Sequence, residues 1–463
     1  MSIFKIIELH TFMIICEVLV LMFIIKMSAE KQKPTEMLAW ILAILLIPYI
    51  AVPFYFIFGI HRKRHSYKKS INLKDTKCSS CKRTYPIGKV LIKHNIPRPT
   101  KNNKLNLYLN GIEAYHELIN EIKKAKKKIY FSTYVFQNDE VTRNILSLLI
   151  QKVNEGIKVK LLIDSIGSYK VYFFQQNIFK KLRSLGGEVC FFMPIIQMPF
   201  RNYINFRNHR KIYLFDDYTV LTGGMNLGNE YMGEKPCKKR WDDILFKIQG
   251  QATNYFHHIF ESDWKYSSKK DIKRKKNYTV KKNYGNNLLQ ITASGPDIPS
   301  DALYESIIAG IHSAQKRIWI VTPYFVPSES LLEALKIAYY KGVDVKIITP
   351  QMSNHTITDL ARNIYMRQLA SIGVDIVLFK KKMIHAKAIL FDNKAVMLGS
   401  VNLDNRSLFL NYEIVTFAYD KEIIKKIHNW MRKFLKNPKN NLSKPSRTKK
   451  IGENIIKVLA PLL

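Results

Sequence analysis

The chain carries the same set of residues twice, at identical spacing. In each copy a lysine follows a histidine by two positions, an aspartate by seven, a glycine by fourteen and an asparagine by seventeen. A repeat of this kind predicts two similar structural units that contribute to one site. The copies comprise His209, Lys211, Asp216, Gly223, Gly224 and Asn226, and His385, Lys387, Asp392, Gly399, Ser400 and Asn402.

Each copy has the pattern of a strand, a turn and a second strand. The apolar runs Ile212–Phe215 and Ala388–Phe391 end in Asp-Asp and Asp-Asn, which are typical turn residues. Side chains two positions apart on a strand share a face, so each histidine is expected beside its lysine. The Gly-Gly or Gly-Ser pair would let a ligand approach the backbone, and the asparagine would offer it an amide donor.

Two such sets suit chemistry at phosphorus. One imidazole can attack as a nucleophile, while the other, protonated, gives a proton to the departing oxygen. Two lysines and two asparagines can hold the non-bridging oxygens, each donor being worth roughly 10²–10³-fold in rate. This chemistry requires neither a metal nor another cofactor. One copy alone would have been interpreted as a solvated strand face.

The repeat extends beyond the motifs. A helix near 115–125 precedes an expected strand at 128–136, a helix and a strand at 156–163. The same order recurs as a helix near 303–314 and strands at 317–325 and 342–348. Apolar strands that alternate with amphipathic helices predict an α/β fold, built as two similar halves with one site between them.

The length of 463 residues accommodates several domains. We expect a membrane anchor at 1–60, a basic linker at 61–100 and two catalytic domains at 101–280 and 281–463. The boundary between the catalytic domains is placed in Tyr266–Asn287, where lysine-rich segments interrupt the apolar periodicity.

The amino-terminal region is strongly apolar. Met37–Gly59 contains no charged residue and is long enough to cross a bilayer. The earlier run Thr11–Ile25 is interrupted by Glu17, so residues 7–27 are predicted as a second span, with a surface-lying helix as the alternative. The basic cluster His61–His65 places the catalytic part on the cytoplasmic side of the inner membrane.

The net charge of +38 at pH 7 has three interpretations. Anionic lipid headgroups attract such a chain, each basic residue near the surface contributing about 1 kcal/mol. Nucleic acid would also attract it, and compositional bias towards lysine explains part of the excess. The apolar amino terminus favours a lipid surface over nucleic acid.

These residues resemble the phospholipase D superfamily, whose signature His-x-Lys-x4-Asp followed by Gly-Gly/Ser-x-Asn is complete in both copies. The resemblance implies two tandem phospholipase D-like sandwich domains related by pseudo-twofold symmetry. It further implies a phosphohistidine intermediate, with His209 as nucleophile and His385 as general acid and base. The motif aspartates, which complete the predicted catalytic set, would act as structural supports. It also implies that a carboxylate downstream of each motif orients the partner histidine. Asp243 and Glu413 fit that role, with Asp242 as an alternative to Asp243.

Finer similarity narrows the family to the bacterial cardiolipin synthases. It implies transfer of a phosphatidyl group from one phosphatidylglycerol to another with release of glycerol, without a nucleotide. Cys78 and Cys81 have no counterpart in the family and lack the second pair that a zinc site requires. The similarity rests on Arg207–Ile212, Gly223–Asn226 with Glu230-Tyr231, Ser294–Asp297, Thr322–Pro327 and Asp404–Ser407.

Other functions share parts of this pattern. A phospholipase D that hydrolyses or exchanges other headgroups has the same motifs and differs in its pocket and in water access. A superfamily nuclease is disfavoured by the apolar amino terminus, and a non-catalytic scaffold by the completeness of both motifs. The sequence makes no prediction about oligomeric state.

Overall fold

The computed structural model describes residues 85–194, 205–272, 282–298 and 300–435 without interruption. It also describes residues 34–47 and scattered positions between 10 and 55 and between 442 and 456.

The first half runs from the first strand to a long helix at its end. Its elements are β1 (Thr100–Tyr108), α5 (Gly111–Lys124), β2 (Lys128–Thr133), α6 (Glu140–Asn154), β3 (Lys158–Asp164), α7 (Tyr169–Phe174), the 3₁₀ helix η2 (Gln176–Phe179), α8 (Lys180–Ser184), β4 (Glu188–Phe192), β5 (Ile212–Phe215), β6 (Thr219–Gly223), β7 (Leu245–Gln249) and α9 (Thr253–Ser268).

The second half repeats this order with small additions. Its elements are β8 (Asn287–Ser294), α10 (Ala302–Ser313), β9 (Arg317–Val321), β10 (Phe325–Val326), α11 (Glu329–Tyr340), β11 (Asp344–Pro350), α12 (Thr356–Ser371), β12 (Asp375–Phe379), β13 (Ala388–Phe391), β14 (Ala395–Gly399), β15 (Leu403–Asp404), α13 (Asn405–Phe409), β16 (Glu413–Ala418) and α14 (Lys421–Leu435).

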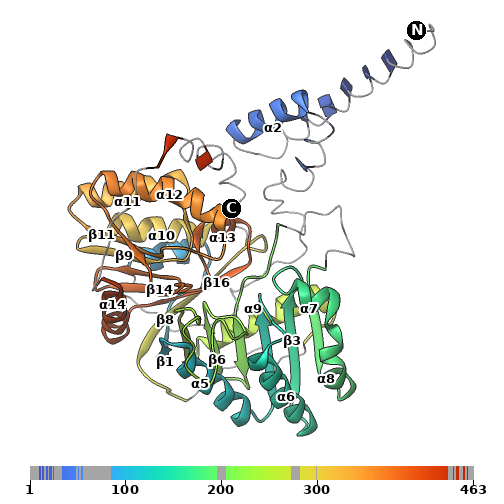
Figure 1. Cartoon of the computed structure of the whole chain (residues 1–463). Coiled ribbons are helices and arrows are strands. Elements are labelled where there is room, and N and C mark those ends of the chain that lie inside the picture. The colour runs from blue at the N-terminus through green and yellow to red at the C-terminus, as the bar shows by residue number, and fades with distance from the viewer. Residues whose placement is uncertain are drawn as a thin grey trace.

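Both halves share one sheet of fourteen strands, in the order β12-β11-β9-β13-β14-β16-β8-β1-β7-β6-β5-β2-β3-β4. The halves occupy opposite ends of the molecule in Figure 1. The order is symmetric about the β8–β1 pair, which is antiparallel and aligns Thr100 with Leu289. The predicted α/β fold of two similar halves is therefore confirmed, and the strand pairing fixes their relative orientation.

The helices begin where the sequence supplies capping residues. Asn110 accepts hydrogen bonds from the backbone N–H groups of the first turn of α5, and Ser328 caps α11 in the same way. Asp139 forms a capping box with Thr142 at the start of α6. Such side chains satisfy N–H groups that have no partner within the helix.

The two faces of the sheet bury different cores. On one face α9 and α14 cover both halves with a continuous cluster that includes Trp264 and Trp430. On the other face one cluster lies under α5 and α6, and another under α10, α11 and α12. Along β5, Ile212 belongs to the first face and Tyr213 to the second. The shared core on one face holds the halves together.

The predicted linker contains a helix that the sequence analysis did not predict. Helix α4 spans Pro86–Lys93, and its Ile87 and Leu91 are buried in the core of the second half. Gly310 on α10 makes room for it, since a Cβ there would lie 3.0 Å from Ile87 Cδ1. The described end of the linker thus packs on the second half before the chain enters β1.

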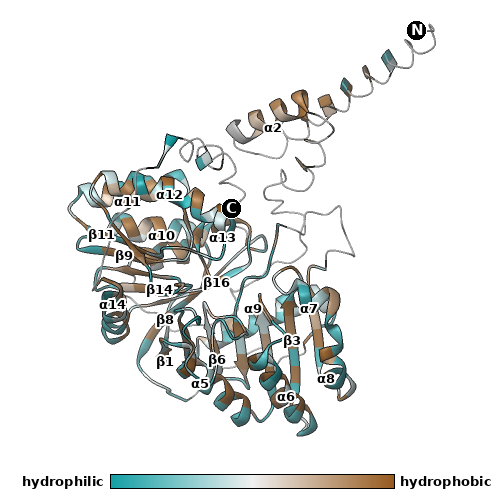
Figure 2. Ribbon diagram, in the orientation of Figure 1, coloured by the Kyte–Doolittle hydropathy of each residue, from teal (hydrophilic) through white to brown (hydrophobic). Residues whose placement is uncertain are grey.

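The amino-terminal prediction falls partly outside the described residues. Helix α2 spans Pro34–Leu46 and is hydrophobic along most of its length (Figure 2). Within the described part of the chain, no helix combines the length and apolar character needed to cross a membrane. Much of the predicted spans 7–27 and 37–59 is not among the described residues.

Candidate active site

The two motif histidines are each held by the opposite half of the molecule. The His209 backbone N–H donates to the Tyr412 carbonyl at 2.9 Å, and the His385 N–H donates to the Asp242 carbonyl at 2.8 Å. Both histidines precede β5 and β13, although the sequence pattern placed them on the strands. Here the chain leaves its own hairpin to pair with the other half, so the two motifs meet at one site.

A carboxylate from the opposite half contacts each imidazole. His209 Nδ1 lies 2.9 Å from Glu413 Oε1, and His385 Nδ1 lies 2.7 Å from Asp243 Oδ2. A carboxylate on Nδ1 favours the tautomer in which Nε2 carries the lone pair. The structure joins Asp243 to His385, while the alternative, Asp242, contributes its backbone carbonyl.

Both motif lysines are buried beside their histidines. Lys211 Nζ donates to the His209 carbonyl at 2.8 Å, and Lys387 Nζ lies 2.9 Å from His385 Nδ1. Burial lowers the pKa of Lys387 to about 8, against the opposing effect of Asp243, and also lowers the pKa of Lys211. Because burial disfavours the charged ammonium form, an anion bound between the two lysines would stabilise their positive charge.

Burial lowers the proton affinity of both imidazoles. Burial lowers the pKa of His209, and Glu413 partly opposes this. Burial together with Lys387 and Lys211 lowers the pKa of His385 well below its ordinary value. Both rings are consequently neutral in the ligand-free site. A bound phosphodiester, being negative, would raise both pKa values.

The glycine and serine before the asparagines make room for the carboxylates. A Cβ on Gly224 would lie 2.1 Å from Asp243 Oδ1. At the equivalent position Ser400 Oγ donates to Glu413. The sequence analysis assigned this pair to ligand approach, whereas in the structure it accommodates the groups that orient the histidines.

The two motif asparagines are buried but have different surroundings. Asn226 Oδ1 accepts from the Val135 N–H at 3.2 Å. Asn402 Oδ1 is buried without a hydrogen-bond partner among the described residues. In this arrangement each amide can direct its N–H groups towards a ligand.

The motif aspartates lie at the far ends of β5 and β13, away from the histidines. Asp216 accepts hydrogen bonds from the backbone N–H groups of residues 126–128, the shortest of them 2.7 Å. Asp392 does the same for residues 315–317. Although burial opposes it, this bonding lowers the pKa of Asp392. The aspartates tie each hairpin to the start of β2 or β9 and do not reach the site.

A buried charge network beneath the first motif was missed by the sequence analysis. Arg210 pairs with Asp263 at 2.8 Å and Asp297 at 3.2 Å, and its Nε donates to the Glu413 carbonyl at 3.1 Å. Arg207 pairs with Asp164 at 2.9 Å. The alternation did contain a signal, because a residue between His209 and Lys211 must point to the opposite face and into the core.

Aromatic rings enclose both imidazoles. The Tyr134 ring centroid lies 4.9 Å from that of His209. Tyr231 and Trp241 lie 5.2 and 5.3 Å from His385. The sequence analysis gave these three residues no role. Their rings limit the access of water to the histidines.

The comparisons with known proteins agree with this geometry. A family model described as the PLD-like domain of cardiolipin synthase matches residues 118–264 and 307–435. A cardiolipin synthase of Clostridium perfringens is 34% identical over 94% of this chain and 95% of its own. The major cardiolipin synthase of Bacillus subtilis is 31% identical over 88% and 89%. The chain belongs to the cardiolipin synthase family.

Two further matches concern the amino-terminal region and the fold of this member of the cardiolipin synthase family. A phospholipase D-nuclease N-terminal family model matches residues 18–59. A solved phosphatidylserine synthase of Haemophilus influenzae has a TM-score of 0.60 at 17% identity, covering 82% of this chain and 100% of its own. That likeness supports the tandem phospholipase D-like fold.

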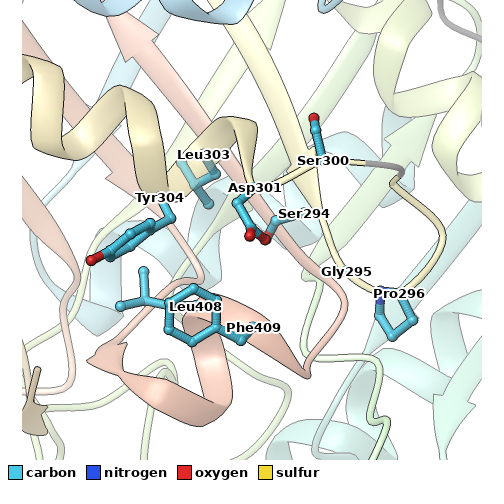
Figure 3. Close-up of a pocket in the computed structure, with 9 residues that line it drawn as sticks. All are labelled: Ser294, Gly295, Pro296, Ser300, Asp301, Leu303, Tyr304, Leu408 and Phe409. Carbon is cyan, nitrogen blue, oxygen red and sulfur yellow. The ribbon is translucent and has the colours of Figure 1, made fainter. Parts of the chain in front are cut away.

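Two cavities in this member of the family differ greatly in size. One lies between the β8–α10 loop and α13 and is closed on one side by Tyr304 and Phe409 (Figure 3). Its volume of about 10 Å³ admits one water molecule. The other, of about 490 Å³, lies between the β2–α6 loop and α7 and is lined by Val135. Only the second is large enough for a lipid headgroup.

Proposed function

We propose that this chain is a cardiolipin synthase that transfers a phosphatidyl group between two phosphatidylglycerol molecules and releases glycerol. The observation that carries the proposal is the pair of carboxylate–histidine contacts, His209 with Glu413 and His385 with Asp243. They meet between the halves of a chain that belongs to the cardiolipin synthase family.

In the first step, His209 Nε2 attacks phosphorus and forms a P–N bond. The bond from phosphorus to the glycerol oxygen breaks, and His385 supplies the proton that this oxygen takes up. His385 acquires that proton when the anionic substrate raises its pKa. Asp243 then stabilises the imidazolium through Nδ1.

In the second step, neutral His385 removes a proton from a glycerol hydroxyl of the second phosphatidylglycerol. That oxygen attacks phosphorus, the P–N bond breaks and His209 is restored. One phosphodiester replaces another, so the reaction is nearly isoenergetic and uses no nucleotide. Excess glycerol should drive it backwards.

The charged groups of the site fit the phosphate. Lys211, Lys387 and the amides of Asn226 and Asn402 would hold the non-bridging oxygens as negative charge develops. Each preorganised donor of this kind is worth roughly 10²–10³-fold in rate. The mechanism needs no metal ion.

The membrane attachment is part of the proposal. We place spans at about 7–27 and 37–59, with the catalytic halves on the cytoplasmic face of the inner membrane. The match of residues 18–59 to an N-terminal family model supports an attached segment of this kind. The substrate would then be a membrane lipid, and anionic lipid would be the partner of the basic chain.

A lipid assay tests the proposal. The full chain in mixed micelles receives headgroup-labelled phosphatidylglycerol without nucleotide, beside His209→Ala and the exposed-histidine control His116→Ala. We expect cardiolipin and free glycerol in equal amounts, lost in His209→Ala and retained in His116→Ala. Phosphatidic acid with glycerol would instead show a hydrolytic phospholipase D, and absence of turnover would contradict both functions.

A further inference from the structure

Helix α7 carries three exposed aromatic side chains, and the ring contacts of Phe173 are with Tyr172 and Phe174 of the same helix. Tyr169, Phe173 and Phe174 are exposed, and Phe174 has 79% of its surface accessible. Leaving several aromatic rings in water is unfavourable, and a group of them on one short helix marks an interaction surface.

The start of α7 is connected directly to the candidate active site. Asp164, at the end of β3, accepts hydrogen bonds from Gly167 N–H and from Asn208 N–H, both at 2.9 Å. Ser168 Oγ donates to the Tyr134 carbonyl, and the Tyr134 ring contacts His209. Helix α7, labelled in Figure 1, therefore begins beside residues that contact the His209 segment.

The charged residues of the segment that contains α7 have one sign, although Asp139 of the β2–α6 loop lines the neighbouring cavity. Residues 165–187 contain four basic residues and no aspartate or glutamate. The basic side chains are exposed. The nearest acidic residues in the sequence are Asp164, which ends β3, and Glu188, which begins β4. Exposed aromatics among cations match a surface that is apolar inside and anionic outside. The basic residues are Lys170, Lys180, Lys181 and Arg183.

The second half offers a matching segment at the equivalent position. The chain after β11 exposes Met352, with 78% of its surface accessible, and Ile357. Arg362 on α12 anchors this segment, because its guanidinium donates to the Gln351 carbonyl at 2.9 Å. Since β3 and β11 correspond in the symmetric sheet, exposed apolar residues flank the site from both halves.

The larger cavity opens beside the same helix. Tyr169 and Lys170 line it together with Gln137 of the β2–α6 loop. It also includes Val135, whose N–H donates to Asn226. A lipid headgroup leaving a membrane at α7 thus has a cavity of about 490 Å³ before it meets the motif residues.

We propose that α7 and the segment Met352–Ile357 dock the catalytic body onto an anionic lipid bilayer, with the active site facing the membrane between them. The inference rests on the proposed function, because the substrate supplied there is a lipid. A bilayer fits better than a second protein, since the aromatics and the cations lie on one segment that contains no acidic residue.

A comparison of two substrate forms tests the docking. The double variant Phe173→Ser/Phe174→Ser and its matched control Tyr340→Ser are prepared as full chains. Tyr340 is also an exposed aromatic, with 70% of its surface accessible. It ends α11 just before the start of β11, whereas α7 follows the end of the corresponding strand β3. Cardiolipin formation is measured in proteoliposomes of long-chain phosphatidylglycerol and with monomeric dihexanoyl phosphatidylglycerol in detergent.

We expect the double variant to lose roughly tenfold or more of its rate in proteoliposomes and to match the wild type on the monomeric lipid, because two apolar anchors are removed. The control should match the wild type in both assays. An equal loss on both substrates, or no loss on either, would overturn the docking surface.

A second readout does not depend on activity. The tryptophan introduced by Phe174→Trp should be quenched by brominated phosphatidylglycerol in proteoliposomes, measured as the difference from the wild type. The tryptophan introduced by Tyr340→Trp should not be quenched. If the wild type makes no cardiolipin, the proposed function is wrong, but the quenching experiment still tests the docking surface. Absence of quenching in Phe174→Trp would overturn the docking surface.

Discussion

The two halves of the active site share a backbone plan but differ in their chemistry. The first histidine contacts a glutamate that also accepts a hydrogen bond from Ser400, whereas the second contacts an aspartate packed against Gly224. Burial raises the pKa of Asp243 to about 6, and burial lowers the pKa of both histidines. The two halves therefore share the positions of the site residues but give the two imidazoles different carboxylate partners with different surroundings.

The largest expected effects come from the histidines. His209→Ala and His385→Ala should each lower cardiolipin formation by about 10³-fold or more, since each removes a reacting group. An activated phosphodiester with a nitrophenol leaving group needs no general acid. With this substrate we expect His385→Ala, but not His209→Ala, to form the covalent phosphohistidine intermediate. Mass spectrometry of the trapped protein measures this. Formation of the covalent intermediate in His209→Ala would instead identify His385 as the nucleophile and His209 as the general acid.

The orienting carboxylates come next. Glu413→Gln and Asp243→Asn keep the shape of the side chain but favour the wrong imidazole tautomer, and we expect each to lower kcat by about 10²–10³-fold. KM and the unfolding temperature should change little. A large fall in the unfolding temperature would show that the carboxylate serves the fold instead.

The Gly224 and Ser400 positions test the asymmetry directly. Gly224→Ser should cost about 10²-fold in activity, because the new Cβ would meet Asp243 Oδ1 at 2.1 Å and displace it from His385. Ser400→Gly removes a single hydrogen bond to Glu413 and should cost only about tenfold. If steady-state assays show equal losses of activity for Gly224→Ser and Ser400→Gly, the two carboxylates do not have the different surroundings described here.

The smallest effect concerns pH. The pKa of Lys387 is lowered to about 8, so its positive charge is present below that pH and lost above it. We expect kcat/KM to fall above about pH 8 and, at the acidic end, to fall as His209 becomes protonated. Lys387→Arg, which stays charged, should move the alkaline limb upwards. An unchanged alkaline limb would exclude Lys387 as its cause.

The sequence was sufficient for the parts that repeat. The two motifs predicted two α/β halves with one site between them, and the resemblance pointed to Asp243 and Glu413, which the structure places on the histidines. The two halves are readable because they rest on spacing and on strand and helix periodicity, whereas the two carboxylates were found through the family resemblance.

The features that the sequence did not reveal depend on contacts between distant segments. Arg210 finds Asp263 and Asp297 in the core, and α4 packs on the second half, but neither pairing leaves a local pattern. The histidines precede their strands because residues 412 and 242 of the opposite halves capture their backbone. The function of Gly224 likewise became visible only with the Asp243 carboxylate beside it.

The crossed pairing of histidine and carboxylate has a consequence during protein synthesis. His209 contacts Glu413, which is 204 residues later in the chain. While the ribosome is still translating the second half, a nascent chain already displays a complete first motif but has no carboxylate to orient its imidazole. We therefore expect the growing polypeptide not to react with the surrounding lipids. It should become active only after β16, the last strand in the sequence, has left the exit tunnel.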